Sequence, residues 1–303
     1  MTLIADAGGT KTEWCIVGDG VVVRRIATAG MNPFHQSEEE TDNILREQLL
    51  PALADVTVDD VYFYGSGCRD ERTTGMRDCL RATLVPRLRG NARNNADACI
   101  HVYSDVFGAA RSLYGDGAGI VCIIGTGSNA CLYDGREIAA SVPPLGFILG
   151  DEGSGAAIGR AFLNAILKRR FGEDLRAAYL HETCQSEEDI LRKVYSGQGT
   201  ARFLASAAPF VLKHIERPEL REMVIDSFSD FFRINVLPLC KHAEEKGRDD
   251  RMTPVKAVGS IAYFFRAELA RAAEDNGLVL AEAVQSPMEG LIRYHLSSAH
   301  SQA

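Results

Sequence analysis

The chain has 303 residues, which is enough for two lobes of ordinary domain size, and its 46% hydrophobic and 24% charged residues are typical of a soluble globular protein. A net charge of -8 without any Lys/Arg run argues against a protein that binds nucleic acid. No apolar stretch approaches the ~20 residues that span a bilayer, and no signal-peptide pattern precedes the first predicted strand, so we expect a cytoplasmic protein that does not bind membranes.

The N-terminal part predicts a meander of three strands. Residues 3–17 read as a strand, a tight turn at residues 8–9 and a second strand. Residues 18–20 form another turn, which leads into a third strand beginning at Val21. Residues 29–34 then follow as a loop.

A helix is predicted next, because Ser37 and Glu40 form a capping box and apolar residues continue at helical spacing to about Leu53. A short strand over 61–64, an arginine-rich helical segment and an apolar strand that ends at Asp105 follow. The order β-β-β-α-β-α-β indicates a mixed sheet that carries helices, which is the α/β class.

The same order starts again near Gly119. Residues 120–133 predict a strand, a glycine turn and a strand, and Asp134-Gly135 supplies a hairpin turn. The repeat is one of topology rather than of residue identity. It predicts an N-terminal lobe over 1–113 and a C-terminal lobe over 114–287, with a C-terminal helix (288–303) that packs back on the first lobe.

Helices and two strands complete the second lobe. The predicted elements are a helix over 154–171, a mostly helical region over 186–247, a strand from Val255 that runs into a turn at Gly259-Ser260, a helix over 261–274, a strand near 278–280 and a helix over 288–296.

The eight cysteines form no C-x-x-C pair. Cys15, Cys122 and Cys131 lie in apolar strands, where a free thiol behaves as a small hydrophobic group. We therefore interpret the cysteines as buried structural thiols rather than as metal ligands.

Two glycine turns, each after a buried strand, are candidate phosphate-binding sites. A glycine lets backbone N–H groups approach a phosphate closely, and neighbouring Thr or Ser hydroxyls can donate to the same oxygens. Either turn alone could be a plain hairpin, but two of them favour a nucleotide held from two sides. Neither is a Walker loop, and no Rossmann G-x-G-x-x-G motif opens a helix. The residues concerned are Gly8, Gly9, Thr10 and Lys11 in one turn, and Gly125, Thr126, Gly127 and Ser128 in the other.

Carboxylates near these turns suggest roles in catalysis. Asp6 ends the first strand and is a candidate ligand of Mg²⁺, through water. Asp105 is the candidate general base, and its alternative role is N-cap of the helix that follows. Asp151 and Glu152 lie in a glycine-rich loop before a helix. They can accept hydrogen bonds from sugar hydroxyls, with Asp151 the preferred candidate, or they can complement the helix dipole.

Four motifs together resemble the N-acetylglucosamine kinase family, which belongs to the actin, hexokinase and heat-shock-chaperone superfamily of two-lobed ATPases. They are D-A-G-G-T-K-T from residue 6, S-D at 104, G-T-G-S-N at 125 and L-G-D-E-G-S at 149. The similarity in motif order covers the whole chain. It implies a ribonuclease-H-like (actin-like ATPase) fold in each lobe, a central cleft that holds ATP and Mg²⁺, and hinge closure on the sugar.

The resemblance also implies a reaction and the roles of single residues. The reaction is transfer of phosphate from ATP to the 6-hydroxyl of N-acetylglucosamine or a related amino sugar, by an enzyme that is usually a homodimer. Anhydro-muramic acid stays open as a substrate. Leu145 stands where animal members have an aromatic residue beside the sugar, so the resemblance implies that this chain lacks the aromatic platform. The implied contacts are Thr10 and Thr126 with phosphate, Gly259-Ser260 with adenosine, Asp105 as base, and Asn32, Gly146 and Asp151 with the sugar.

The phosphate turns also resemble those of the ATPase activators of 2-hydroxyacyl-CoA dehydratases and benzoyl-CoA reductases. Those proteins hold an iron–sulfur cluster between subunits through cysteines, and no candidate cysteine pair stands out here. The chain also shows no insertion typical of filament-forming actin-like subunits, and it lacks the zinc-binding cysteines and DNA-binding arm of another sugar-kinase family on this fold. These comparisons favour the kinase.

Overall fold

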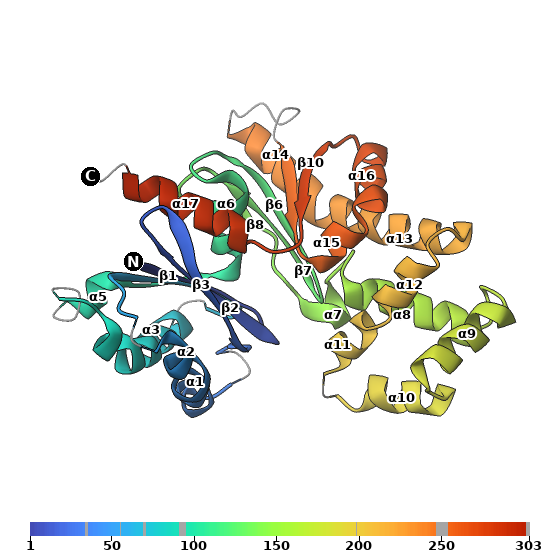
Figure 1. The fold of residues 1–303 in the computed structure, drawn as a ribbon. Helices are drawn as coiled ribbons and strands as arrows, with labels where there is room; N and C mark the ends of the chain where they lie inside the picture. Colours follow the sequence, from blue (N-terminus) through green and yellow to red (C-terminus); the bar gives the residue numbers. More distant parts are fainter. Residues whose placement is uncertain are drawn as a thin grey trace. The chain divides into compact units, whose positions relative to one another are not determined.

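The computed structural model describes residues 1–33, 36–54, 56–68, 71–90, 95–197, 199–246 and 254–300. The chain divides into two compact units, Met1–Asp116 with Pro287–Ala303, and Gly117–Ser286. Each unit is built on a five-stranded mixed sheet (Figure 1). Within the described ranges, no helix is both long enough and apolar enough to cross a membrane.

The sheet of the first unit has the strand order β3-β2-β1-β4-β5. β1 and β2, and β2 and β3, are antiparallel, which confirms the predicted meander; β1, β4 and β5 are parallel. The carboxyl ends of these three parallel strands therefore meet at one edge of the sheet. The bounds are β1 (Thr2–Ala7), β2 (Lys11–Gly18), β3 (Val21–Ala29), β4 (Asp60–Gly65) and β5 (Ile100–Ser104).

Helices cover both faces of the first sheet. The predicted capping box is present: Ser37 N–H donates to Glu40 Oε2, and Glu40 N–H donates to Ser37 Oγ. The helix that it opens passes through a π-helical turn before it ends at Leu53. The helical elements are α1 (Glu38–Ile44), the π-helical turn Leu45–Leu49, α2 (Leu50–Leu53), α3 (Glu71–Leu84), α5 (Ala96–Cys99), α6 (Asp105–Tyr114) and α17 (Met288–His300).

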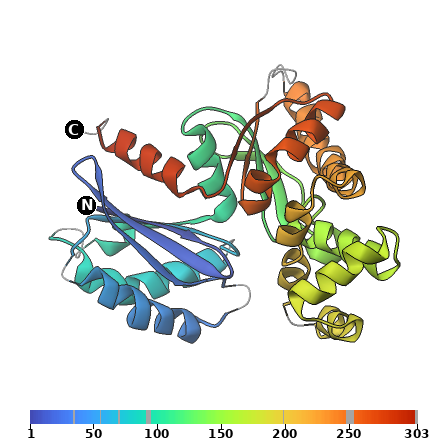
Figure 2. The ribbon, with the colours of Figure 1, turned by 45° about the vertical axis from the view of Figure 1, so that its right-hand side comes forward.

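Alternation of side chains along the strands divides the first core into two layers. Trp14 and Phe63 are buried on the face covered by α1 and α3. Ile4 and Tyr64 are buried on the opposite face, where Leu291 of α17 joins them. Figure 2 shows α1 and α3 on one side of this sheet and α17, in red, on the other. The C-terminal helix therefore completes the core that the N-terminal strands begin.

The second sheet repeats the arrangement of the first, with the order β10-β9-β6-β7-β8. β6, β7 and β8 form an antiparallel meander, and β6, β9 and β10 are parallel. The topological repeat predicted from the sequence is thus confirmed. The bounds are β6 (Gly119–Ile124), β7 (Ser128–Tyr133), β8 (Ile138–Ser141), β9 (Val255–Val258) and β10 (Leu280–Val284).

The helices of the second unit enclose a large apolar core that includes Phe162, Tyr179 and Phe228. Three elements end at other residues than predicted. The helix predicted over 154–171 ends at Leu167, the strand predicted near 278–280 runs to Val284, and the helix predicted over 288–296 runs to His300. The helical elements are α7 (Gly146–Leu149), α8 (Gly155–Leu167), α9 (Glu173–Thr183), α10 (Glu187–Tyr195), α11 (Thr200–Ala205), α12 (Ala208–Lys213), α13 (Pro218–Phe231), the π-helical turn Phe232–Val236, α14 (Leu237–Glu245), α15 (Ser260–Phe264) and α16 (Arg266–Asp275).

Candidate functional site

The first glycine turn (residues 8–10) joins β1 to β2 at the edge of the sheet where the parallel strands end. Gly8 N–H donates to the carbonyl of Lys11 at 3.0 Å, and Gly30 N–H donates to the carbonyl of Thr10 at 3.1 Å. A Cβ at Gly30 would lie 2.4 Å from the backbone nitrogen of Thr10, so only glycine fits there. Gly30 therefore holds the end of β3 against the turn, a role that its loop position in the sequence did not indicate.

Asp6, Lys11 and Asp105 come together beside this turn. Burial first, and then the negative charges of Asp105 and Glu13, raise the pKa of Asp6 to about 7, and Lys11 opposes the shift. Glu13 is the cross-strand partner of Asp6 in β2 and shares its face of the sheet. Carboxylates this close together attract a cation strongly, so the residues fit a divalent metal ion.

The donor set suits a hydrated ion rather than a protein-enclosed one. Over the described ranges, no group of three or more His, Cys, Asp or Glu side chains is placed to hold a metal ion. Mg²⁺ keeps several waters and is commonly bound through one or two carboxylates together with substrate phosphates. Asp6 is thus suited to holding Mg²⁺ through water.

Asp105 is the first residue of α6 and not its N-cap. Ser104 caps the helix, because its Oγ accepts a hydrogen bond from Phe107 N–H at 3.3 Å. Asp105 Oδ1 accepts from the adjacent Val106 N–H at 2.9 Å. The alternative role of Asp105 as the helix cap is therefore wrong.

Asn32 lies in the loop after β3 and is held by Gln36. Its N–H donates to Gln36 Oε1 at 2.8 Å, and Gln36 N–H donates back to the Asn32 carbonyl at 3.1 Å. Gln36 Nε2 also donates to the Gly30 carbonyl at 3.0 Å. One side chain therefore connects the Asn32 loop to the backbone beside the first glycine turn. Phe34, the last residue of the predicted loop, lies outside the described residues.

The second glycine turn (residues 125–128) joins β6 to β7 and is held by the start of α8. Gly155 N–H donates to the Gly125 carbonyl at 2.8 Å, and Ala156 N–H donates to the Thr126 carbonyl at 3.1 Å. The first N–H groups of α8 are thus satisfied by the turn. Among the described residues, the N–H groups of Thr126 and Gly127 have no acceptor, and such groups can bind phosphate oxygens.

Gly259 ends the neighbouring strand β9 and packs directly on this turn. Its φ is +128°, and a Cβ there would lie 2.3 Å from the Ile124 carbonyl oxygen. Glycine is therefore required both for the backbone conformation and for the close approach. The result is that Ser260 lies near Gly125 and Thr126.

A cavity of about 540 Å³ opens beside these residues and has mainly apolar walls. This volume is in the range of small-molecule sites, and apolar walls with a few polar groups suit a purine ring. The cavity brings together three predicted nucleotide residues. It adds side chains from α11, α12 and α15 that the sequence showed only as helical positions: Arg202, Ser206, Pro209, Leu212 and Phe264 line it together with Gly125, Thr126 and Ser260.

The acidic loop (residues 150–154) places Asp151 against the second glycine turn. Ser128 N–H donates to Asp151 Oδ1 at 3.3 Å, and Asp151 adopts a left-handed φ of +57°. Burial raises the pKa of Asp151, and the hydrogen bond from Ser128 opposes the shift. Gly146, also predicted at this site, begins α7 with a φ of +74°.

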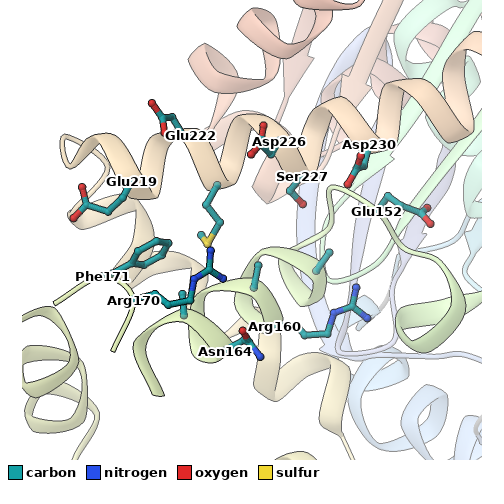
Figure 3. Close-up of a pocket in the computed structure, with 14 residues that line it drawn as sticks. Glu152, Arg160, Asn164, Arg170, Phe171, Glu219, Glu222, Asp226, Ser227 and Asp230 are labelled. Carbon is teal, nitrogen blue, oxygen red and sulfur yellow. The ribbon is translucent and has the colours of Figure 1, made fainter. Parts of the chain in front are cut away.

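Glu152, the other acid of this loop, faces a different environment. It lies at one end of a cavity of about 650 Å³ between α8 and α13 (Figure 3). Acidic side chains of α13 line one wall, and Arg160 and Arg170 lie across from them. The two neighbouring acids therefore face different regions. The Asp151 carboxylate contacts the second glycine turn, and Glu152 lines this charged cavity. The α13 acids are Glu219, Glu222, Asp226 and Asp230.

The cysteines mostly follow the prediction. Cys15, Cys122 and Cys131 are buried in strands, as expected, and all eight thiols are free. Cys184 is exposed at the end of α9, and Cys79 and Cys99 are only partly buried, so the interpretation as buried thiols is wrong for these three. Cys68 is buried near Asp105, and burial raises the pKa of its thiol to about 12.

Several solved structures match almost the whole chain, among them the following three. A protein from Porphyromonas gingivalis described as a "Putative N-acetylglucosamine Kinase" is 42% identical, with a TM-score of 0.90 over 99% of this chain and 100% of that one. A Chromobacterium violaceum protein described in the same words is 18% identical, with a TM-score of 0.69 over 97% and 98%. A ROK family glucokinase from Streptomyces griseus, in complex with glucose and AMPPNP, is 15% identical, with a TM-score of 0.53 over 97% of each chain. No family model and no curated protein sequence matches.

Proposed function

Because the chain belongs to the N-acetylglucosamine kinase family, we propose that it is an ATP-dependent kinase that phosphorylates the 6-hydroxyl of N-acetylglucosamine or a related amino sugar. Family membership rests on 42% identity over the full length of the Porphyromonas protein. The two units are actin-like ATPase lobes, the fold class predicted from the sequence. We further propose that the enzyme works in the cytoplasm as a homodimer.

The single observation that best supports a phosphoryl-transfer site is the pairing of Asp6 with Asp105. Asp6 lies near the end of β1 and Asp105 directly after β5, two parallel strands with β4 between them. Ionising both carboxylates next to a glycine turn and Lys11 is unfavourable without a cation. Magnesium would neutralise charge on the transferred phosphate. Lys11 can contribute a further positive charge to phosphate oxygens.

Asp105 acts in this proposal as the general base that accepts the proton of the sugar hydroxyl. Its carboxylate has one oxygen occupied by Val106 N–H, which fixes the side chain at the start of α6. A fixed carboxylate beside the hydroxyl accepts its proton as the oxygen attacks the γ-phosphate. The N–H groups of Thr126 and Gly127 serve the phosphates, and the cavity of about 540 Å³ takes the adenine.

Sugar recognition is assigned to Asn32, Gly146 and Asp151. Gln36 fixes the backbone of Asn32, and Ser128 N–H holds the carboxylate of Asp151, so the Asn32 backbone and the Asp151 side chain are positioned before substrate arrives. Leu145, which precedes Gly146, is 58% exposed, so its apolar side chain is available to contact a substrate. We propose that it replaces the aromatic residue of the animal enzymes with a smaller apolar surface.

A coupled assay of ADP release tests this function. N-acetylglucosamine, N-acetylmannosamine, glucosamine and glucose are supplied separately to the purified protein with Mg²⁺ and ATP. We expect release that depends on an N-acetylated amino sugar. ADP release that no sugar alters, or a brown iron-containing protein when it is purified without oxygen, would instead identify an activator ATPase.

A further inference from the structure

Glu152 accepts hydrogen bonds at both its backbone carbonyl and its side-chain carboxylate, although it is not one of the proposed sugar ligands. Its carbonyl oxygen accepts a hydrogen bond from Ser128 Oγ at 2.7 Å, which connects it to the second glycine turn. Its carboxylate Oε2 accepts from Asn235 Nδ2 at 3.0 Å. Because Glu152 directly follows Asp151, these two hydrogen bonds also restrict where the Asp151 carboxylate can lie.

Asn235 comes from the π-helical turn Phe232–Val236, which interrupts the helix between α13 and α14. Only 9% of Asn235 is exposed, so its amide is confined by packing. π-Helical turns are rare and frequently occur at functional sites. The turn therefore provides a buried amide donor opposite the acidic loop.

The acidic loop also packs on the helix that leads into this turn. Gly153 has a φ of +71°, and a Cβ there would lie 2.9 Å from the Cβ of Phe231. The backbone of the loop thus contacts α13 closely, and the carboxylate of Glu152 reaches past it to Asn235. Packing and hydrogen bonding together give the loop one conformation, in which Asp151 keeps a left-handed backbone that is unfavourable for a residue with a side chain.

We infer that Asn235 is a positioning residue for sugar binding: by holding Glu152, it keeps Asp151 in the orientation that the acceptor requires. This inference rests on the proposed kinase function. It assigns Asn235 no contact with either substrate. Loss of the hydrogen bond should therefore weaken sugar binding and leave nucleotide binding to the second unit intact.

The first test removes the Asn235 amide donor or replaces it with a carboxylate. In Asn235→Ala the donor is lost, and in Asn235→Asp a second carboxylate faces Glu152. We expect the KM for the sugar to rise about 10-fold or more, because the partly buried carboxylate of Glu152 loses its partner or is repelled. The Kd of ADP, measured by calorimetry without sugar, should stay within about twofold. Asn276→Ala is the matched control, since it removes an Asn side chain that donates to the Ala272 carbonyl of α16; both constants should be unchanged.

A double variant tests the pair directly. Glu152→Gln combined with Asn235→Asp again pairs an amide with a carboxylate. The amide is then at position 152 and the negative charge at position 235. We expect it to recover most of the sugar affinity lost in Asn235→Asp alone. If Asn235→Asp does not fold, the double variant and Asn235→Ala still provide the comparison, because neither places two carboxylates together.

The outcomes separate the inference from the proposed function. Wild-type protein without sugar-dependent ADP release refutes the kinase proposal, and the inference with it. An active wild type whose variants lose melting temperature but keep the sugar KM refutes only the inference, because Asn235 is then purely structural. Equal losses of sugar and nucleotide affinity also refute it. A selective rise in the sugar KM with recovery in the double variant supports it.

Discussion

Replacing Asp6 by Asn tests the environment of this carboxylate without an assay of catalysis. The substitution keeps the size of the side chain and removes the group that titrates. The pKa of Asp6 is raised from 3.8 to about 7 in the folded protein, by burial first and by Asp105 and Glu13 next. Between these two pH values the folded state binds more protons than the unfolded state. The stability that Asp6 contributes is therefore fully present below pH 3.8 and is lost as the pH rises through 7.

The size of this effect follows from the shift. One pKa unit corresponds to about 1.4 kcal/mol, so the change from 3.8 to about 7 sets an upper bound of about 4 kcal/mol on the stability lost by pH 8. Water still reaches this partly exposed side chain and reduces the penalty. We expect the Asp6→Asn variant to be roughly 1–4 kcal/mol more stable than wild type at pH 8. The advantage should shrink as the pH is lowered to 5.

Urea unfolding at pH 5 and pH 8, without divalent cations, measures the difference. Asp19→Asn is the control, because Asp19 is exposed in the turn between β2 and β3 and its φ of +50° also suits Asn. A second series with Mg²⁺ and ADP should stabilise wild type at pH 8 more than the variant, since a neutral amide attracts a hydrated dication less. An Asp6→Asn variant that is less stable than wild type at pH 8, or that differs equally at both pH values, would refute the reasoning.

Three further substitutions test the remaining parts of the site. Asp105→Asn should lower kcat at least ~10²-fold with a near-native melting temperature, because Ser104 keeps capping α6; a variant that keeps most of its kcat would remove Asp105 from the role of base. Alanine at Asn32 or Asp151 should raise the sugar KM far more than the ATP KM, by ~1–3 kcal/mol of lost binding, and steady-state kinetics with each substrate varied would reveal the opposite pattern. Gly259→Ala should lower the melting temperature and weaken ADP binding in calorimetry, since its Cβ would lie 2.3 Å from the Ile124 carbonyl oxygen; unchanged ADP affinity would place the nucleotide elsewhere.

Local pattern was sufficient to predict most of the fold. The strands of both meanders follow from apolar runs bounded by glycine, and Ser37 and Glu40 specify a helix start on their own. The predicted boundaries of helices and strands were wrong where two neighbouring residues carry the same local signal. Ser104 and Asp105 are both good cap residues, and only the end of β5 in the sheet decides that Ser104 is the cap.

Contacts between distant residues could not be read from the sequence. Gln36 and Asn235 each hold a backbone or side chain of the candidate site, yet neither belongs to a recognisable motif. Gly30 matters because of how closely β3 approaches the first turn, which depends on the assembled sheet. The lining of the cavity beside Thr126 likewise depends on how α11 and α12 pack, since helical periodicity specifies a buried face but not its neighbour.

The position of α17 has a consequence for how the chain folds during synthesis. Met288 and Leu291 close a core that includes Ile4 and Cys15, which are among the first residues translated. At about 5–20 residues per second, the ribosome needs about 10–30 s to make the intervening second unit. During that time α6 is the helix that packs on this face of the N-terminal sheet, and the apolar side chains that α17 later buries are open to chaperones or to aggregation. The first unit can therefore complete its folding only after α17 has been synthesised. Removing α17 should destabilise the N-terminal strands most, although they are the first part of the chain to be made.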